Sequence, residues 1–498
     1  MLVANRGEIA VRVIRACRDL GMEAVAVYSD ADRDALHVRM ADEAYPIGPA
    51  PAKESYLRGA ALVEVATRSG CDAVHPGYGF LSENADFAEA VTRAGIAFVG
   101  PPAEVQRLLG EKTRARRLAK DAGIPVAEGA AEPLRDLDDA RAAAKRVGYP
   151  VMLKAAGGGG GKGMRAVRRP EELESAWRMA TGEATSAFGA PALFLERLIE
   201  GARHIEMQIV ADHHGNVVWL GERDCSLQRR HQKLIEESPG PSVDDALRAR
   251  LGDAAARVAD AAGYRNAGTV EFLVAPGGEI YFLEVNTRLQ VEHPVTELVT
   301  GIDLVVLQFK LAAGERLPFT QAEVHPRGSA IELRVTAEDA LGGFVPSSGR
   351  VALARIPSGP GVRVDHALYA GIAIPDEYDP LLAKIVVWGM TRTEALVRAR
   401  RAVRETIIAG VPTSLSFHSR TLEEPDFAAG RYDTGYIDAH WPPAEEPALE
   451  DSAVQAAAIV AVLARRGARG GSPTAARWTA QTGQVSDWSL AAREDALR

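Results

Sequence analysis

Polar and apolar residues alternate strictly along the stretch Glu284–Glu292. In an extended chain, successive side chains point to opposite faces, so this stretch predicts a strand with one apolar and one polar face. Its apolar face would carry Val285, Thr287, Leu289 and Val291. The polar face would carry two carboxylates, two amides and a guanidinium: Glu284, Asn286, Arg288, Gln290 and Glu292.

A second strand, residues 269–274, precedes this one and is joined to it through Pro276-Gly277-Gly278. If Gly277 and Gly278 form a two-residue hairpin loop, Glu271 lies directly opposite Glu284. Facing like charges are unfavourable, and a divalent cation held between them would relieve the repulsion. Oxygen ligands suit Mg²⁺ or Mn²⁺, and Asn286 adds a third oxygen to the predicted metal site. The alternative is a solvated polar face on an ordinary hairpin.

Composition excludes several classes of protein. The 498 residues carry a net charge of −9, which argues against a nucleic-acid partner held through its phosphates. No apolar run approaches the roughly 18 residues of a membrane span, and the first residues lack the long apolar core of a signal peptide. The three cysteines are scattered and odd in number. They indicate a reducing compartment, without disulfides or a zinc site, and we expect the protein to be cytoplasmic.

Strand-like and helix-like runs alternate through residues 1–110, which predicts a parallel, doubly wound sheet. Ligands of such sheets lie beyond the carboxyl ends of the strands. The loops at residues 5–8 and 75–80 fall there, although glycines at strand ends can simply form turns.

Five successive glycines, Gly157–Gly161, follow an apolar strand at residues 151–155. Glycine carries an entropic cost, so a run of five is better explained as a mobile loop whose bare N–H groups close on phosphates. Lys154 and Lys162 flank the run and supply positive charge. The loop is not a Walker A motif, because Ala156 and Gly163 stand where that motif has Gly and Ser or Thr. A flexible linker is the alternative.

The rest of the chain continues as mixed α and β structure. We expect helices at residues 103–122, 244–262 and 295–313, a small α+β insertion at 123–200, a strand at 204–210 and a further α+β unit at 329–440. The polar stretch Glu222–Lys233 is either a solvated face or an anion site. Residues 442–447 read as a linker, and the last fifty residues as too few for a domain.

A phosphate-closing glycine loop, flanking lysines and a metal-binding hairpin together describe an ATP-grasp site, and the resemblance then becomes specific. From about residue 2 to about 440, the chain resembles biotin carboxylase, in particular the biotin-carboxylase part of an acyl-CoA carboxylase α subunit. The motifs that carry this resemblance are residues 4–10, 75–84, 154 with 157–163, 222–233 and 284–294.

The resemblance implies an α/β and α+β fold in three domains. These are an N-terminal doubly wound parallel sheet (1–110), a central ATP-grasp domain (111–315) with a glycine-rich lid (about 125–200), and a C-terminal α+β domain (325–440). Residues 441–498 would be a linker, the start of a region leading to a missing carrier part.

The resemblance also implies an activity: ATP-dependent carboxylation of biotin N1 by bicarbonate through carboxyphosphate, the first half-reaction of an acyl-CoA carboxylase. Mg²⁺ or Mn²⁺ would be held by Glu271, Glu284 and Asn286. The residues expected to bind ATP are Lys112, Lys154, Gly159, Gly160, Lys162, Glu196, Leu198, His204, Gln228 and His231.

The reacting groups also carry over by resemblance. Arg288 and Lys233 would bind bicarbonate, and Glu292 would take its proton. Arg334 would stabilise the biotin enolate as an oxyanion partner. The remaining residues expected beside biotin are Tyr78, Gly79 and Gln290.

A few positions depart from the family's pattern. Thr336 and Ala340 stand where Asn and Pro are usual, which predicts a local loop change, and Arg197 stands where lysine is common near the adenine.

The expected partners are a biotin carboxyl carrier protein or domain and a carboxyltransferase subunit, in a homodimer or larger complex. Biotin is attached to a lysine, usually in Met-Lys-Met, and Lys384 is the last lysine of this chain. We therefore expect the carrier to be a separate protein or a part not contained in this sequence. Two other functions stay open: a carboxylate–amine or carbamoyl-phosphate type ATP-grasp ligase, and a nucleotide sensor without turnover.

Overall fold

The computed structural model describes residues 1–130, 132–155, 164–188 and 192–442. Its N-terminal part is a five-stranded parallel sheet with strand order β3-β2-β1-β4-β5, as the strand–helix alternation predicts. The strands are β1 (Leu2–Val3), β2 (Val25–Ser29), β3 (Glu43–Gly48), β4 (Ala73–His75) and β5 (Ala97–Phe98). The helices between them are α1 (Gly7–Asp19), α2 (Leu36–Met40), α3 (Gly59–Arg68) and α4 (Ala85–Arg93).

The middle of the chain contains a small antiparallel sheet of order β7-β6-β8, covered by two helices. Its strands are β6 (Val151–Ala155), β7 (Arg165–Val167) and β8 (Leu193–Arg197), and its helices are α7 (Leu137–Val147) and α8 (Leu173–Phe188). The glycine run lies at residues 156–163, outside the described residues.

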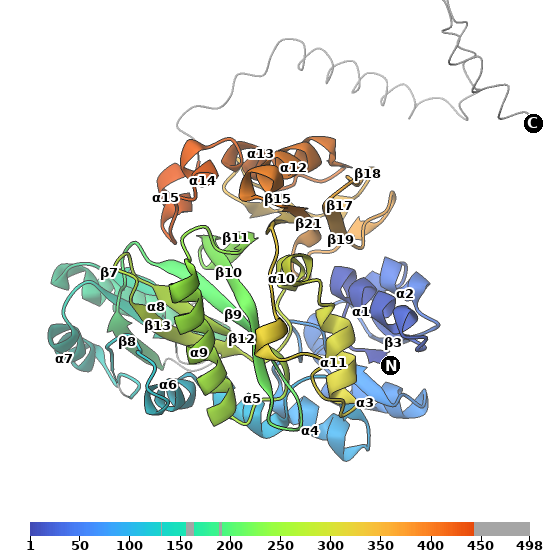
Figure 1. Ribbon diagram of the computed structural model, residues 1–498, viewed down its shortest axis with the longest axis horizontal. Helices are drawn as coiled ribbons and strands as arrows, with labels where there is room; N and C mark the ends of the chain where they lie inside the picture. Colours follow the sequence, from blue (N-terminus) through green and yellow to red (C-terminus); the bar gives the residue numbers. More distant parts are fainter. Residues whose placement is uncertain (131, 156–163, 189–191, 443–498) are drawn as a thin grey trace, which may run out of the picture. The chain divides into compact units, whose positions relative to one another are not determined.

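An eight-stranded antiparallel sheet of order β13-β12-β9-β10-β11-β14-β21-β19 joins the central and C-terminal parts (Figure 1). Strands β11 and β14 pair from Ser238↔Ala330 to Ile235↔Leu333, so hydrogen bonding is continuous between the two parts. The strands are β9 (Arg203–Ala211), β10 (Val217–Arg229), β11 (Gln232–Ser238), β12 (Asn266–Val274), β13 (Ile280–Asn286), β14 (Ser329–Thr336), β19 (Val362–His366) and β21 (Leu381–Gly389).

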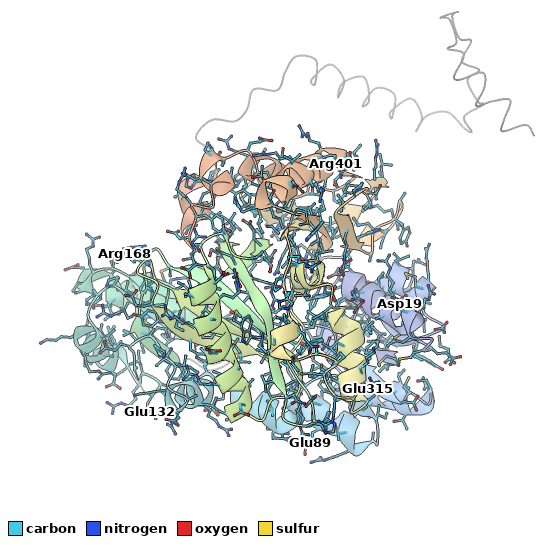
Figure 2. All side chains as sticks on the ribbon, viewed as in Figure 1. Asp19, Glu89, Glu132, Arg168, Glu315 and Arg401 are labelled. Carbon is cyan, nitrogen blue, oxygen red and sulfur yellow. The ribbon has the colours of Figure 1, made fainter. Side chains whose placement is uncertain are left out.

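Helices pack on this sheet and bury its apolar side chains. α9 (Asp245–Ala261) begins where the Asp244 side chain accepts a hydrogen bond from the Leu247 N–H, and its buried face packs on β9 and β10. Charged side chains such as Asp19, Arg168 and Glu315 are exposed at the periphery (Figure 2). The remaining helices are α5 (Ala103–Gly110), α6 (Lys112–Asp121), α10 (His293–Thr300), α11 (Leu304–Ala312), α12 (Arg392–Glu405), α13 (Leu415–Thr421), α14 (Pro425–Ala428) and α15 (Tyr436–His440).

Short two-stranded ladders complete the C-terminal part. They pair β15 (Glu338–Asp339) with β16 (Val345–Pro346), β17 (Gly349–Arg350) with β20 (Ala373–Ile374), and β18 (Leu353–Arg355) with β22 (Ile407–Ala409).

The predicted strand at 284–292 is wrong beyond Asn286, where β13 ends. Glu292 instead occupies the N-cap position of α10, without a capping bond from its side chain, and Pro294 lies in the first turn. Proline is well suited to the first turn of a helix because no N–H is needed there, and its fixed φ starts the helix. The alternating pattern therefore covers a strand end, a loop and a helix start.

Two predicted helices are each divided in two. The prediction at 295–313 is interrupted by Gly301, whose φ of 72° ends α10. Glycine adopts this left-handed conformation without a Cβ clash, and its N–H donates to the Glu297 carbonyl. The prediction at 103–122 is divided at Glu111, whose extended backbone separates α5 from α6.

Candidate active site

Lys233 on β11 lies at the centre of a buried acidic cluster. Its Nζ donates to Glu206 Oε2 at 2.6 Å, to Glu292 Oε1 at 2.6 Å and to Glu271 Oε1 at 3.1 Å. Burial by itself would lower the pKa of Lys233, but the attraction of the surrounding anionic groups raises it well above its ordinary value. The ammonium is therefore charged at neutral pH and holds three strands and the start of α10 together.

Glu292 is held by a second cation, Arg334 on β14. Arg334 Nη2 donates to Glu292 Oε2 at 2.8 Å, and its Nε donates to Glu236 Oε1 at 2.5 Å. Burial would raise the pKa of Glu292, yet Lys233 and Arg334 hold it well below its ordinary value. In Glu236 burial dominates, and the pKa rises to about 7. Two carboxylates on one guanidinium thus have very different proton affinities.

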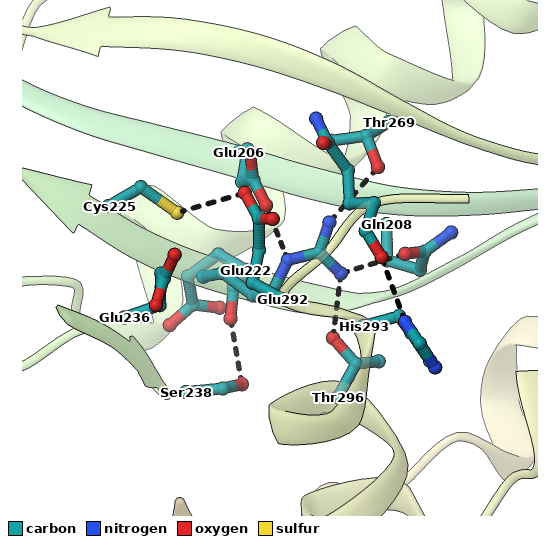
Figure 3. Close-up of polar contacts among 12 residues, drawn as sticks. Glu206, Gln208, Glu222, Cys225, Glu236, Ser238, Thr269, Glu292, His293 and Thr296 are labelled. Atoms are coloured by element: carbon teal, nitrogen blue, oxygen red, sulfur yellow. Dashed lines mark hydrogen bonds and ion pairs between the residues drawn. The ribbon is translucent and has the colours of Figure 1, made fainter. Parts of the chain in front are cut away.

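A fully buried guanidinium, that of Arg223, supports this cluster. Figure 3 labels its partners Glu206, Gln208, Thr269 and Thr296. It donates to Glu206, to Gln208 Oε1 at 2.7 Å, to Thr296 Oγ1 at 2.9 Å and to Thr269 Oγ1 at 3.0 Å. These partners come from β9, β12 and α10. The arginine therefore fixes where Glu206 stands, and Glu206 in turn holds Lys233.

The facing carboxylates predicted on the hairpin are confirmed, because Glu271 and Glu284 are partners in the β12–β13 register. The loop differs from the prediction. Ala275 N–H donates to the Glu279 carbonyl at 2.9 Å, which leaves a three-residue loop at Pro276–Gly278. A register shift between Glu271 and Phe272 restores the facing pair.

Donors converge on Glu271, one of the residues expected to hold the metal. Asn286 Nδ2 and Gln290 Nε2 donate to Glu271 Oε1 at 2.8 and 3.0 Å, and His204 Nε2 lies 2.8 Å from Oε2. Directly opposed residues of a strand pair have Cβ atoms about 5 Å apart, so Glu271 and Glu284 can reach one cation. Carboxylate and amide oxygens fit Mg²⁺, and the residues present fit the expected ion.

Arg288 is held within the hairpin's polar row even though that row is not a strand. It donates to Asn286 Oδ1 and to Gln290 Oε1, each at 2.8 Å, and to Glu83 Oε2 at 3.0 Å. The sequence predicts no role for Glu83, although this residue lies in one of the motifs that carry the resemblance. Its contact with Arg288 places the loop that follows β4 of the N-terminal sheet beside the site.

The expected nucleotide residues divide into two groups. Lys112 Nζ lies 3.5 Å from Glu284 Oε2, a residue expected to hold the metal. On the small sheet, Lys154 pairs with Glu196, which also accepts from Arg116 Nη1 at 2.7 Å. Burial would raise the pKa of Glu196, but Lys154 and Arg116 lower it.

Arg116 was missed by sequence reasoning. Its place one helical turn after Lys112 on α6 was the available signal. Leu198 follows β8, and its N–H donates to the Pro150 carbonyl at 3.0 Å.

The other residues expected to bind the nucleotide lie nearer the acidic cluster. His204 is buried against Glu271, whose attraction outweighs burial and raises the pKa of the imidazole. Gln228 and His231 stand at the β10–β11 turn, where Arg230 and His231 have φ of 49° and 66°. The residues expected in the glycine loop, Gly159, Gly160 and Lys162, lie outside the described residues.

The stretch Glu222–Lys233 is not a solvated face over its first half. Glu222, Arg223, Asp224 and Ser226 are all buried in β10. Asp224 accepts from Arg203 at 2.9 Å, and Glu222 from Arg248 at 2.7 Å. These charges are paired internally, which is how buried ionised groups are tolerated.

The residues expected beside biotin come from the N-terminal sheet and from the cluster. The Tyr78 hydroxyl donates to Glu8 of α1, and burial, followed by the Glu8 charge, raises the pKa of Tyr78 well above its ordinary value. Gly79 has a φ of 68°, a conformation suited to glycine. Gln290 donates to Glu271, and Arg334 donates to Glu292. Both of these carboxylates also accept from Lys233.

Comparison with known proteins places three family profiles along the chain. They are described as "Biotin carboxylase, N-terminal domain" (residues 1–106), "Carbamoyl-phosphate synthase L chain, ATP binding domain" (111–320) and "Biotin carboxylase C-terminal domain" (332–439). Biotin carboxylase 1 of Bacillus subtilis is 49% identical over 441 residues, which is 88% of this chain and 98% of that protein. A pyruvate carboxylase component of Methanothermobacter thermautotrophicus is 49% identical over 88% of this chain and 89% of its own.

Solved structures agree. The biotin carboxylase domain of the 2-oxoglutarate carboxylase of Hydrogenobacter thermophilus, a dimer in complex with MgADP, ADP and bicarbonate, superposes with a TM-score of 0.86. The two sequences are 45% identical, and the match covers 88% of this chain and 97% of the chain in that structure. Biotin carboxylase of Campylobacter jejuni, bound to β,γ-ATP, gives the same TM-score and identity, over 88% of this chain and 98% of its own.

The fold and the site define an ATP-grasp enzyme, with lysines and facing carboxylates on antiparallel strands. The chain belongs to the biotin carboxylase family, the ATP- and Mg²⁺-dependent ligases that carboxylate biotin. Among the residues that the structure describes, no helix is both long and apolar enough to cross a membrane.

Proposed function

We propose that bicarbonate binds against Lys233 and Arg288 and that Glu292 removes its proton. The observation that carries the proposal is that Glu292 holds Lys233 on one oxygen and Arg334 on the other. Bicarbonate bound against Lys233 draws this cation away from Glu292. The pKa of the carboxylate then rises from its low value, which makes it a better base.

The deprotonated bicarbonate oxygen then attacks the γ-phosphorus of ATP, and ADP leaves. Carboxyphosphate breaks down to CO₂ and phosphate, the phosphate takes the N1 proton of biotin, and N1 bonds to CO₂. Arg334 stabilises the enolate oxygen of biotin during this step. Mg²⁺, held by Glu271, Glu284 and Asn286, would neutralise charge on the transferring phosphoryl group.

On the nucleotide side we assign the phosphates to Lys112, Lys154 and the glycine loop with Gly159, Gly160 and Lys162. The adenosine is assigned to the residues around β8 and the β10–β11 turn: Glu196, Leu198, His204, Gln228 and His231. Biotin is assigned to Tyr78, Gly79, Gln290 and Arg334. This assignment follows the proposed division into an N-terminal domain (1–110), an ATP-grasp domain (111–315) with a lid (about 125–200) and a C-terminal domain (325–440).

For the biological reaction we propose the first half-reaction of an acyl-CoA carboxylase in the cytoplasm. The partners would be a biotin carrier protein or domain, a carboxyltransferase and a second copy of this chain. Relatives named for pyruvate and for 2-oxoglutarate carboxylation are of similar identity. We assign the choice of acceptor to the carboxyltransferase partner.

The direct test is ADP release from ATP, Mg²⁺ and bicarbonate, with and without free biotin. We expect a bicarbonate-dependent rate that biotin stimulates. Turnover without any biotin response would favour the carbamoyl-phosphate type of ligase, whose ATP-binding profile matches residues 111–320. ATP binding without turnover would favour a nucleotide sensor.

A further inference from the structure

One buried lysine outside the assigned site touches all three parts of the chain. Lys384 on β21 is fully buried and is the last lysine of the sequence. Its Nζ lies 3.2 Å from Glu8 Oε1 on α1 and donates to the Val291 carbonyl at 2.9 Å. Lys384 is also the register partner of Arg334 across β14–β21.

The contacts of Lys384 lead in two directions. Through Glu8 Oε1 they reach the Tyr78 hydroxyl, which donates to the same oxygen. Through the Val291 carbonyl they reach the peptide that carries Glu292. The residue expected at biotin and the residue expected to act as base are therefore joined by one carboxylate, one ammonium and one carbonyl.

Several acidic side chains surround Lys384. Asp365 on β19 lies 3.9 Å away, and Glu332 on β14 is fully buried. Among the described residues, neither Glu332 oxygen has a hydrogen-bond partner. Burial lowers the pKa of Lys384, but attraction to Glu8, Glu332 and Asp365 outweighs it and raises the pKa. The lysine is thus a buried cation at neutral pH.

Stability alone explains such an arrangement poorly. Replacing a buried ion pair with apolar residues of similar volume is often neutral or stabilising. A cation that donates to the backbone next to the proposed base does something an apolar residue cannot, because it fixes the position of that carbonyl. The alternative is an ordinary buried ion pair without influence on catalysis.

We propose that Glu8 and Lys384 are positioning residues that couple the biotin side of the site, at Tyr78, to the base Glu292. Biotin bound against Tyr78 is sensed through the shared Glu8 oxygen and through Lys384, which holds the Val291 peptide. The inference rests on the proposed roles of Tyr78 and Glu292. Neither positioning residue touches the reacting atoms.

The test is a double-mutant cycle on the full chain with free biotin as substrate. We expect Tyr78→Phe to raise the KM for biotin at least fivefold. Lys384→Met should do the same and lower kcat at least tenfold, with the KM for ATP within twofold of wild type. Both residues act through Glu8. We therefore expect the kcat/KM for biotin of the double variant to be no more than threefold below that of the less active single variant.

The exposed Lys120→Met is the matched control and should leave all constants unchanged. A Lys384→Met enzyme with an unchanged KM for biotin, or fold-changes that multiply in the double variant, would overturn the coupling. If Lys384→Met does not fold, Glu8→Gln replaces it, because glutamine is nearly the same size but, without the carboxylate charge, holds Tyr78 and Lys384 more weakly. There we expect at least a threefold rise in the KM for biotin, and no rise would overturn the proposal. A wild-type chain without biotin-stimulated ADP release would instead refute the proposed function.

Discussion

Replacing Glu292 with glutamine separates the proposed base from its structural partners. The carboxylate accepts from Lys233 at 2.6 Å and from Arg334 at 2.8 Å, with one cation on each oxygen. Glutamine is nearly the same size but has one oxygen, so its amide group must face one of the two cations. The substitution therefore removes the base and leaves a buried cation with one acceptor fewer.

The size of each effect follows from these contacts. A positioned general base contributes about 10²- to 10⁴-fold, so we expect kcat to fall within that range. Breaking a buried ion pair costs about 3–5 kcal/mol of unfolding free energy. Lys233 keeps Glu206 and Glu271, and Arg334 keeps Glu236, so we place this loss at the lower end, about 3 kcal/mol.

The assay is ADP release with bicarbonate and biotin, together with the KM for ATP and a urea unfolding curve. The KM for ATP should stay within about threefold, because the nucleotide contacts are elsewhere. Glu297→Gln is a matched control, since Glu297 is buried and binds Arg12 and Arg363 on its two oxygens, at 3.0 and 2.6 Å. It should lose stability without losing turnover. A Glu292→Gln enzyme within tenfold of wild-type kcat would remove Glu292 as the base.

Three further predictions concern the metal, the buried support and pH. Glu271→Gln should raise the Mg²⁺ concentration needed for half-maximal activity at least fivefold, measured by a Mg²⁺ titration; an unchanged requirement would count against the facing carboxylates. Arg223→Met should lower the unfolding free energy by about 3–5 kcal/mol in urea, because Glu206 loses a buried partner; a loss below about 1 kcal/mol would contradict this. Glu236 has a folded pKa of about 7 against an ordinary 4.5, so the folded state binds the extra proton between these values and stability falls as pH rises from 4.5 to 7. Between pH 4.5 and 7, the unfolding free energy of Glu236→Gln should therefore rise relative to that of wild type by on the order of 3 kcal/mol. Equal pH dependence of the two proteins would refute the raised pKa of Glu236.

Much of the fold and the local geometry of the site were predictable from short-range pattern. The parallel N-terminal sheet follows from strand–helix alternation. The facing of Glu271 and Glu284 was predicted from a two-residue loop, but in the structure it depends on a three-residue loop and a register shift after Glu271. The prediction failed where local pattern was ambiguous. The alternation through Glu292 suited a strand, but Pro294 starts a helix there and β13 ends at Asn286.

The amino-acid sequence alone determined the chemistry of this protein, in the lysines, the glycine run and the polar row from Glu284 to Glu292. Only the tertiary structure decided which charges meet. Glu8 and Lys384 are 376 positions apart, and Arg334 reaches Glu292 across the join between two parts of the chain. Sequence periodicity predicts only which residues share a face of one helix or strand. The partner of a buried charge depends on how several elements pack together, because a charge removed from water needs an opposite charge beside it.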